Sequence, residues 1–242
     1  MILAKADIIA GLQKELQALQ GIRPALQDVG LNKKLGPIIY AFPNHSFPLG
    51  AIHEFIGTSN EEKACGYGFV SAVLSSSMKN NGAVVWIANS AQWFPPALKR
   101  FGVDAGRIIF IHPKEKDIAW ITEEALLCGK ISAVVSEMKD ISFTASRRLQ
   151  LAVEKSKTTG FIFRSDPKQI HATSSMARWK ISSLPGRSYG KLPGVIFPTW
   201  NIELLKVRNG KPRSWQMEYS GGKFKELQRF SILHSLPQQK TG

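Results

Sequence analysis

The stretch 52–64, IHEFIGTSNEEKA, has the pattern of a buried strand that runs into a phosphate-binding turn. A working P-loop reads GxxxxGK followed by Ser or Thr. Its backbone N–H groups hold the phosphates, the lysine neutralises them and the hydroxyl binds magnesium. Gly57 and Lys63 keep this spacing, but Glu62 replaces the second glycine and Ala64 replaces the hydroxyl residue. The stretch therefore predicts a nucleotide-binding scaffold whose own carboxylate repels ATP.

Short apolar runs alternate with helical stretches after residue 52. Runs that are apolar on both faces, and that are separated by crossover helices, indicate a parallel sheet covered on each side. The expected strands are 52–56, 83–87, 108–111, 132–136 and 161–163, and the expected helices are approximately 68–80, 94–101, 117–129 and 142–158. The fold class is therefore α/β, with a mostly parallel twisted sheet and helices on both faces.

The C-terminal part changes to extended, basic and aromatic sequence. Residues 174–181, SSMARWKI, predict a strand. Residues 200–219, WNIELLKVRNGKPRSWQMEY, predict an antiparallel β-hairpin, because Asn209-Gly210 can supply the positive φ angles of a tight turn between alternating apolar residues.

The N-terminal part predicts a short amphipathic helix over residues 7–20, with an apolar stripe of Ile8, Leu12, Leu16 and Leu19. The stripe packs either on the protein's own core or on a partner. Residues 21–49 contain several prolines and glycines and predict an irregular connection. The expected organisation is an N-terminal helix and linker (1–46), a core with a basic β extension (47–236) and a flexible tail (237–242).

The charge is strongly positive and unevenly placed. The net charge is +14, and residues 164–242 hold 14 Lys/Arg against 4 Asp/Glu, whereas residues 1–163 hold 18 against 14. Such asymmetry favours an acidic partner, either nucleic acid or an acidic protein surface. The alternative is that the charge only keeps the chain soluble.

The sequence has no pattern typical of a membrane span, a signal peptide or a metal site. No apolar run approaches the roughly 18 residues of a membrane span, and charges interrupt the N-terminal apolar stretch where a signal peptide would be apolar. We therefore expect a cytoplasmic protein. The five histidines and two cysteines show no metal-binding spacing, so we expect no metal.

Taken in order, these segments resemble a RecA-type core, and within that superfamily they resemble the ImuA family, the RecA-like accessory proteins of bacterial mutagenic translesion synthesis. The resemblance covers roughly residues 47–220. It rests on FPLGAIHEFIG (47–57), WIANSAQWFPPALKRFGVD (86–104), SAVVSE (132–137), ATSSMARWKI (172–181) and the hairpin 200–219. The last two segments are the most specific.

The resemblance implies a nucleotide site that has lost its catalytic parts. Active relatives carry a glutamate after the second strand that activates water, and Ser90 stands at that position here. Glu137 ends the strand that corresponds to Walker B, but alone it cannot hold magnesium. We therefore expect no ATP hydrolysis and no cofactor.

Two sets of basic residues are further candidates. Lys206 and Arg208 resemble the basic pair that RecA-like proteins extend into a neighbouring subunit's nucleotide, although exposed hairpin charge is the plainer interpretation. The candidates for contact with DNA or an acidic partner are Arg164, Lys168, Arg178, Trp179, Lys180, Arg187 and Lys191. In the competing view, Trp179 packs under the sheet edge and the cations are solvated.

The resemblance implies an adaptor in SOS-type damage tolerance that works at the nucleoid. The expected partners are an inactive Y-family polymerase homologue and an error-prone replicative-type polymerase. RecA, single-stranded DNA and a second copy of the chain are additional candidates. Two alternatives remain: a SulA-like inhibitor of the tubulin-like cell-division protein, and a weak DNA-dependent ATPase.

Overall fold

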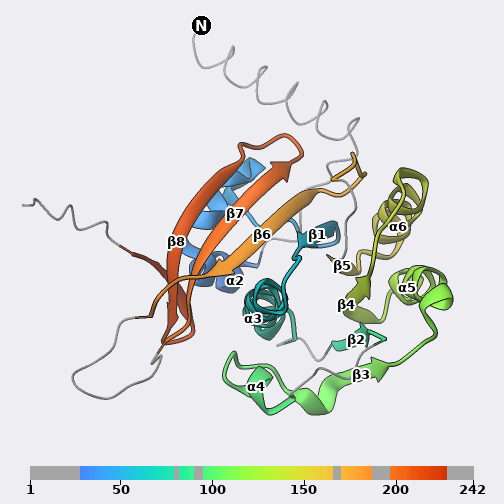
Figure 1. Cartoon of the computed structure of the whole chain (residues 1–242), viewed down its shortest axis with the longest axis horizontal. Coiled ribbons are helices and arrows are strands. Elements are labelled where there is room, and N and C mark those ends of the chain that lie inside the picture. Colours follow the sequence, from blue (N-terminus) through green and yellow to red (C-terminus); the bar gives the residue numbers. More distant parts are fainter. Residues whose placement is uncertain (1–27, 79–81, 90–94, 166–169, 187–196, 228–242) are drawn as a thin grey trace, which may run out of the picture.

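A nine-stranded sheet organises the computed structural model, which describes residues 28–78, 82–89, 95–165, 170–186 and 197–227 (Figure 1). The strand order is β3-β2-β4-β5-β1-β6-β7-β8-β9. The predicted helix 7–20 and the tail 237–242 lie outside the described residues.

The sheet is parallel from β3 to β6 and antiparallel from β6 to β9. The strands are β1 (Ile52–Ile56), β2 (Ala83–Ile87), β3 (Ile108–Ile111), β4 (Ile131–Met138), β5 (Thr159–Arg164), β6 (Ala177–Ser183), β7 (Thr199–Val207), β8 (Arg213–Ser220) and β9 (Lys223–Glu226). The helices are α2 (Val29–Leu35), α3 (Asn60–Ser77), α4 (Pro95–Lys99), α5 (Ile118–Leu127) and α6 (Phe143–Ser156).

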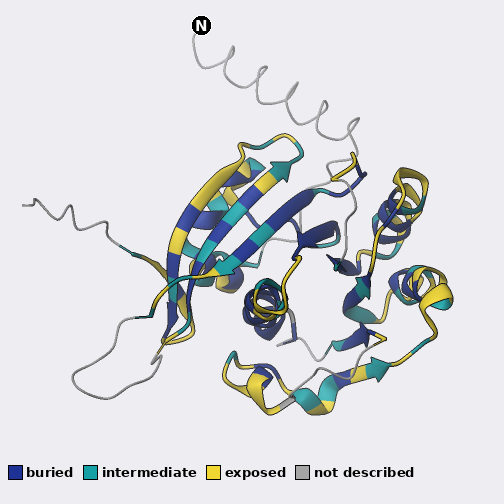
Figure 2. Cartoon of the chain, viewed as in Figure 1, coloured by how far each residue is buried: buried dark blue, intermediate teal, exposed yellow. Residues whose placement is uncertain are grey.

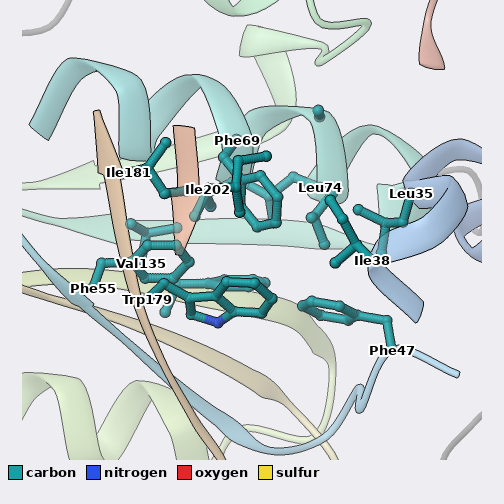
Figure 3. Packing of buried hydrophobic residues seen from close by; sticks show 14 of the residues in the cluster. Leu35, Ile38, Phe47, Phe55, Phe69, Leu74, Val135, Trp179, Ile181 and Ile202 are labelled. Atoms are coloured by element: carbon teal, nitrogen blue, oxygen red, sulfur yellow. The ribbon is translucent and has the colours of Figure 1, made fainter. Parts of the chain in front are cut away.

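Apolar side chains fill both faces of the sheet. On one face, Phe55, Phe69 and Trp179 pack between the sheet, α3 and the N-terminal segment (Figure 3). On the other face, Ile52, Leu126 and Val153 pack between the sheet, α5 and α6. Successive residues of β1 point to opposite faces, so one apolar strand serves both clusters. The predicted mostly parallel sheet with helices on both faces is confirmed.

The connection before β1 is part of the core. Leu31, Leu35, Ile38 and Phe47 are all buried in the cluster around α3. Asp28 starts α2, because its carboxylate accepts a hydrogen bond from the Leu31 N–H at 2.9 Å. The prediction of an irregular connection is wrong for most of residues 28–47, because they form α2 and two short 3-10 helices that pack into the domain that follows.

Helix α3 begins at Asn60, eight residues before the predicted start at residue 68. Gly66 and Gly68 both lie inside this helix. A Cβ atom at Gly66 would lie 2.7 Å from the Phe163 ring, and one at Gly68 would lie 2.8 Å from the Trp200 ring. The glycines therefore let the helix approach the sheet closely.

The predicted C-terminal hairpin is present, but its connection is not a tight turn. The last β7–β8 pair joins Leu204 to Arg213, and Asn209 has a φ of 55°. The end of β7 instead pairs with β6, and the Lys211 N–H donates to the Ala41 carbonyl at 3.2 Å.

Strand β9 was not among the predicted elements. Gly221 and Gly222 have φ angles of 59° and 73° and join the paired residues Ser220 and Lys223. Two glycines between alternating strands are the signal of such a turn.

His53 gives the fold a pH-dependent stability. The ring is fully buried and stacks on Phe47 at 4.4 Å. Its Nε2–H donates to the Pro48 carbonyl at 2.8 Å, and Nδ1 accepts from the Trp179 indole at 3.4 Å. Burial lowers the pKa of His53 to about 4, so the ring is neutral in the folded protein.

We therefore expect the free energy of unfolding to fall with acidification. The unfolded chain takes up this proton near its ordinary value and the folded chain only near pH 4, so stability is complete above about pH 6.5 and declines by about 3 kcal/mol towards pH 4. Urea unfolding of the wild type and His53→Phe at several pH values measures this. The variant should lose most of the slope in that window, whereas exposed His45→Gln should keep it. An unchanged slope in His53→Phe would contradict the assignment.

Candidate functional site

The turn after β1 is closed by the side chain of Glu62. Ser59 caps α3, because its hydroxyl accepts from the Glu62 N–H at 3.1 Å. The Glu62 carboxylate turns back and accepts from the Thr58 N–H at 2.9 Å and the Thr58 hydroxyl at 3.1 Å. Lys180 on β6 lies 3.2 Å from the same carboxylate. A carboxylate of the chain itself therefore takes hydrogen bonds that a P-loop offers to phosphate.

Glu62 is held as an anion. Partial burial opposes its ionisation, but the Thr58 N–H and the Lys180 ammonium outweigh this and lower the pKa of the carboxyl. The backbone at Gly57 lies close to the first turn of α3, because a Cβ atom at Gly57 would be 3.3 Å from the Lys63 backbone nitrogen.

A second internal contact joins Glu137, at the end of β4, to Tyr67 and to the charge of Lys63. Lys63 is half-buried, Ala64 is exposed, and the Lys63 charge acts on Glu137 at the end of β4. Tyr67, one turn after Lys63, hydrogen-bonds Glu137 and packs on Phe163 with ring centroids 4.6 Å apart. Burial raises the pKa of Glu137, and burial beside that carboxylate raises the pKa of Tyr67. Ser90 lies outside the described residues.

A buried ion cluster lies on the opposite face of β1 from α3. Arg164 donates to one Glu54 oxygen at 2.6 Å, and Arg178 donates to the other at 2.8 Å. Thr173 and Ser175 donate to that second oxygen at 2.8 and 3.2 Å. Burial opposes ionisation of Glu54, but the two guanidinium groups outweigh it and lower the pKa of the carboxyl. Glu54 is therefore a fully bonded buried anion.

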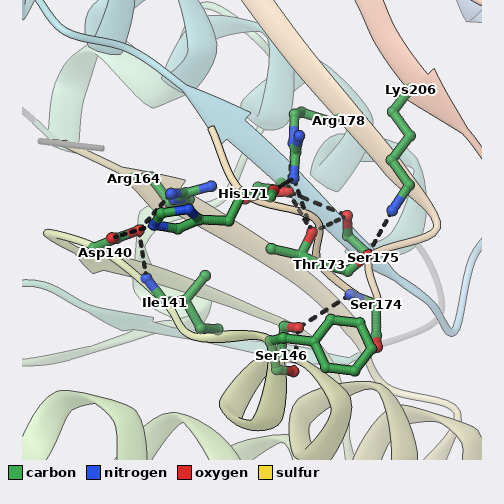
Figure 4. Close-up of polar contacts among 12 residues, drawn as sticks. Asp140, Ile141, Ser146, Arg164, His171, Thr173, Ser174, Ser175, Arg178 and Lys206 are labelled. Carbon is green, nitrogen blue, oxygen red and sulfur yellow. Dashed lines mark hydrogen bonds and ion pairs between the residues drawn. The ribbon is translucent and has the colours of Figure 1, made fainter. Parts of the chain in front are cut away.

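The cluster extends to the loops that follow β4 and β5 (Figure 4). Arg164 also donates to Asp140, and His171 lies 3.7 Å from the same carboxylate. The Ser174 N–H donates to the Ser146 hydroxyl on α6 at 3.0 Å. These contacts fix residues 170–176 against β1 and α6.

Lys206 and Arg208 bind this loop within the same chain. The Lys206 ammonium donates to the Thr173 carbonyl at 2.5 Å, and Arg208 donates to the Ser174 carbonyl at 3.0 Å. Burial, with the nearby Arg178 charge, lowers the pKa of Lys206. The pair therefore neither reaches outward nor serves only as solvated charge; it holds the loop after β5.

The structure corrects the expectation that Arg164, Arg178 and Trp179 contact an outside partner. Both arginines are buried on Glu54, and Trp179 is fully buried against Phe69. The competing view that Trp179 packs internally is confirmed, but β6 is an interior strand and not the sheet edge. Lys180 is partly exposed but paired with Glu62. Lys168, Arg187 and Lys191 lie outside the described residues.

The exposed cations of the C-terminal extension lie elsewhere. They are Lys211, Arg213, Lys223 and Lys225, in the β7–β8 connection, β8 and β9. For Lys223 and Lys225 the sequence signal is their alternation with the buried Phe224, which places both lysine side chains in solvent.

Two absences can be stated for the described ranges. Within them, no group of three or more His, Cys, Asp or Glu side chains is placed to hold a metal ion. Nor does any helix in the described part of the chain have the length and apolar character needed to cross a membrane.

The fold and the turn closed by Glu62 define an α/β protein with a mostly parallel sheet and a C-terminal antiparallel extension. No protein-family model matches the chain. It is 31% identical over 190 residues to Protein ImuA of Caulobacter vibrioides, in strains NA1000 / CB15N and ATCC 19089 / CIP 103742 / CB 15, an alignment that covers 73% of this chain and 78% of each relative. The chain belongs to the ImuA family, and this membership supports a role in the mutagenic response to DNA damage.

Among solved structures, SulA from Pseudomonas aeruginosa is similar, with a TM-score of 0.40 and 21% identity. The match covers 47% of this chain and 97% of that one.

Loss of the Glu54 charge should destabilise the fold. In Glu54→Gln, the two buried guanidinium groups lose their shared anion, and breaking such a pair costs about 3 kcal/mol or more. We expect the melting temperature to fall by roughly 10 °C in a chain of this size. The control is Glu124→Gln, because Glu124 is exposed and should change the free energy of unfolding by less than about 0.5 kcal/mol. Equal melting temperatures for the two variants would show that the cluster contributes little.

Proposed function

We propose that this protein is a non-catalytic adaptor of the mutagenic DNA-damage response, which binds other proteins and does not hydrolyse ATP. The observation that carries the proposal is the Glu62 carboxylate bonded to the Thr58 N–H and paired with Lys180.

Electrostatics supports the exclusion of nucleotide. The Glu62 carboxylate alone would repel a phosphate oxygen about 4 Å away by about 4 kcal/mol at the effective dielectric constant of a protein surface, and its pairing with Lys180 offsets part of this repulsion. The same phosphate would also have to displace the Glu62 oxygen from the Thr58 N–H. Ala64 offers no hydroxyl to magnesium, and Glu137 is already bonded to Tyr67. Phosphoryl transfer depends on positioning and charge stabilisation, so these losses together support inactivity.

The nucleotide part of the proposal is tested by calorimetry with MgATP. Wild-type protein should show no saturable binding at millimolar nucleotide. Glu62→Gly removes the carboxylate and frees the Thr58 N–H, so the variant should bind at least about tenfold more tightly. Glu61→Gly is the matched control, because it makes the same change in the first turn of α3 and leaves Glu62 in place. Tight magnesium-dependent binding by the wild type would contradict the proposal.

The proposed partners are the inactive Y-family polymerase homologue and the error-prone replicative-type polymerase. RecA and single-stranded DNA are secondary candidates, and the proposed location is the cytoplasm, at the nucleoid. Two segments are proposed to dock these partners: residues 7–20, with their apolar stripe, and the basic β extension. In the extension, the cations available to an acidic surface are those that the structure leaves exposed, such as Lys223 and Lys225.

We expect charge reversal on β9 to weaken binding to the Y-family homologue. Lys223→Glu with Lys225→Glu should lower the affinity by about tenfold at low salt, and Leu12→Asp with Leu16→Asp should lower it similarly by breaking the apolar stripe. Biolayer interferometry with the purified homologue measures both. The control pair is Lys114→Glu with Lys116→Glu, two exposed lysines far from β9 in the sheet order. If both docking variants bind as the control does, these segments are not the docking surfaces.

A further inference from the structure

The outer surface of the α5–α6 layer exposes large apolar side chains. Trp120 is 62% exposed, Leu127 40% and Leu151 49%. The two helices lie side by side on one face of the sheet, and their outward sides are exposed (Figures 1 and 2). Trp120 and Leu127 are seven residues apart, so they share one side of α5. An exposed tryptophan flanked by leucines is typical of a protein-binding surface.

The charges of the same face are divided between the two helices. Residues 117–129, which include α5, carry Asp117, Glu123 and Glu124 and no Lys or Arg. Helix α6 presents Arg147, Arg148 and Lys155 to solvent. Arg148 pairs with Glu123 across the helices at 2.5 Å, whereas for Glu124 and Arg147 no ion pair is found within the described residues. The face is thus acidic on one side, basic on the other and apolar between.

This pattern is complementary to itself. Helix α5 joins β3 to β4 and α6 joins β4 to β5, and these strands are all parallel, so the two helices run in the same direction. A two-fold axis that runs along the helices, between them and above the layer, places α5 of one copy over α6 of the other. Glu124 of each copy then faces Arg147 of the other, once in each half of the contact.

The heights of the side chains along the helices also agree. Glu123 and Arg148 are level, because they form an ion pair. At about 1.5 Å per residue, Leu127 lies about 6 Å beyond this level and Leu151 about 4.5 Å beyond it. A two-fold rotation leaves the position of each side chain along the axis unchanged, so Leu127 of one copy meets Leu151 of the other. By the same count, Glu124 lies within about 3 Å, along the axis, of Arg147 in the other copy.

We propose that two copies of this chain associate through their α5–α6 faces in this two-fold arrangement. The shared area is small, since two helices about 10 Å wide and about 15 Å of common length give about 300 Å² on each copy. A stable interface buries about 800 Å² on each side, so the dimer is a transient one that forms at high concentration. The inference does not depend on the nucleotide site or on the proposed polymerase partners.

Sedimentation velocity of the full chain tests the proposal. From about 5 to 300 µM at low salt, the average mass should rise from 26.8 kDa towards twice that value, and added salt should reduce the rise. Trp120→Glu should stay monomeric throughout the range. Tyr40→Glu is the matched control, because Tyr40 is 59% exposed but belongs to the segment that packs on the opposite face of the sheet, so it should dimerise as the wild type does.

Charge reversal distinguishes the two-fold pairing from unspecific adhesion. Glu124→Arg and Arg147→Glu should each lose self-association, because each variant sets like charges against one another. An equimolar mixture of the two should associate, since every Glu124–Arg147 contact between the unlike chains is again of opposite sign. A wild type that remains monomeric at about 300 µM, a Trp120→Glu variant that dimerises normally, or a mixture that stays monomeric would overturn the proposal.

Discussion

The buried carboxylate of Glu54 joins the two halves of the sheet. It lies between the guanidinium groups of Arg164 on β5 and Arg178 on β6, so the cluster spans the strands on both sides of β1. Removing three charges from water is costly, and the cost is offset only where every oxygen is bonded. The hydroxyls of Thr173 and Ser175 complete this shell, and they fix the loop after β5 beside β1.

Bonding of charged groups within the chain also determines the structure of the turn that resembles a P-loop. Charged groups at positions where a motor protein would meet nucleotide are satisfied inside this chain: Glu62 by Thr58 and Lys180, and Glu137 by Tyr67. A ligand must displace an internal partner before it gains anything, which lowers its net affinity. These internal contacts hold the turn after β1 and the end of β4 in place.

Local features could be read from the sequence, and long-range partners could not. Ser59 and Glu62 lie within one helical turn of each other, so the stretch 52–64 alone predicts that a carboxylate lies at the phosphate-binding turn. The role of Glu54 was hidden in the run IHEFI, because Arg164 and Arg178 lie more than a hundred residues further along the chain. Only the strand register, which sets Arg178 directly beside Glu54, reveals that this arginine is internal. A glutamate inside a strand expected to be buried on both faces is the available hint.

Glu62 is proposed to take the place of phosphate at the start of α3. A crystal structure of the protein grown with saturating MgATP tests it most directly. We expect density for the Glu62 carboxylate within hydrogen-bond distance of the Thr58 nitrogen and no triphosphate beside Lys63. A triphosphate and metal seated against Lys63, with Glu62 turned away from Thr58, would contradict it.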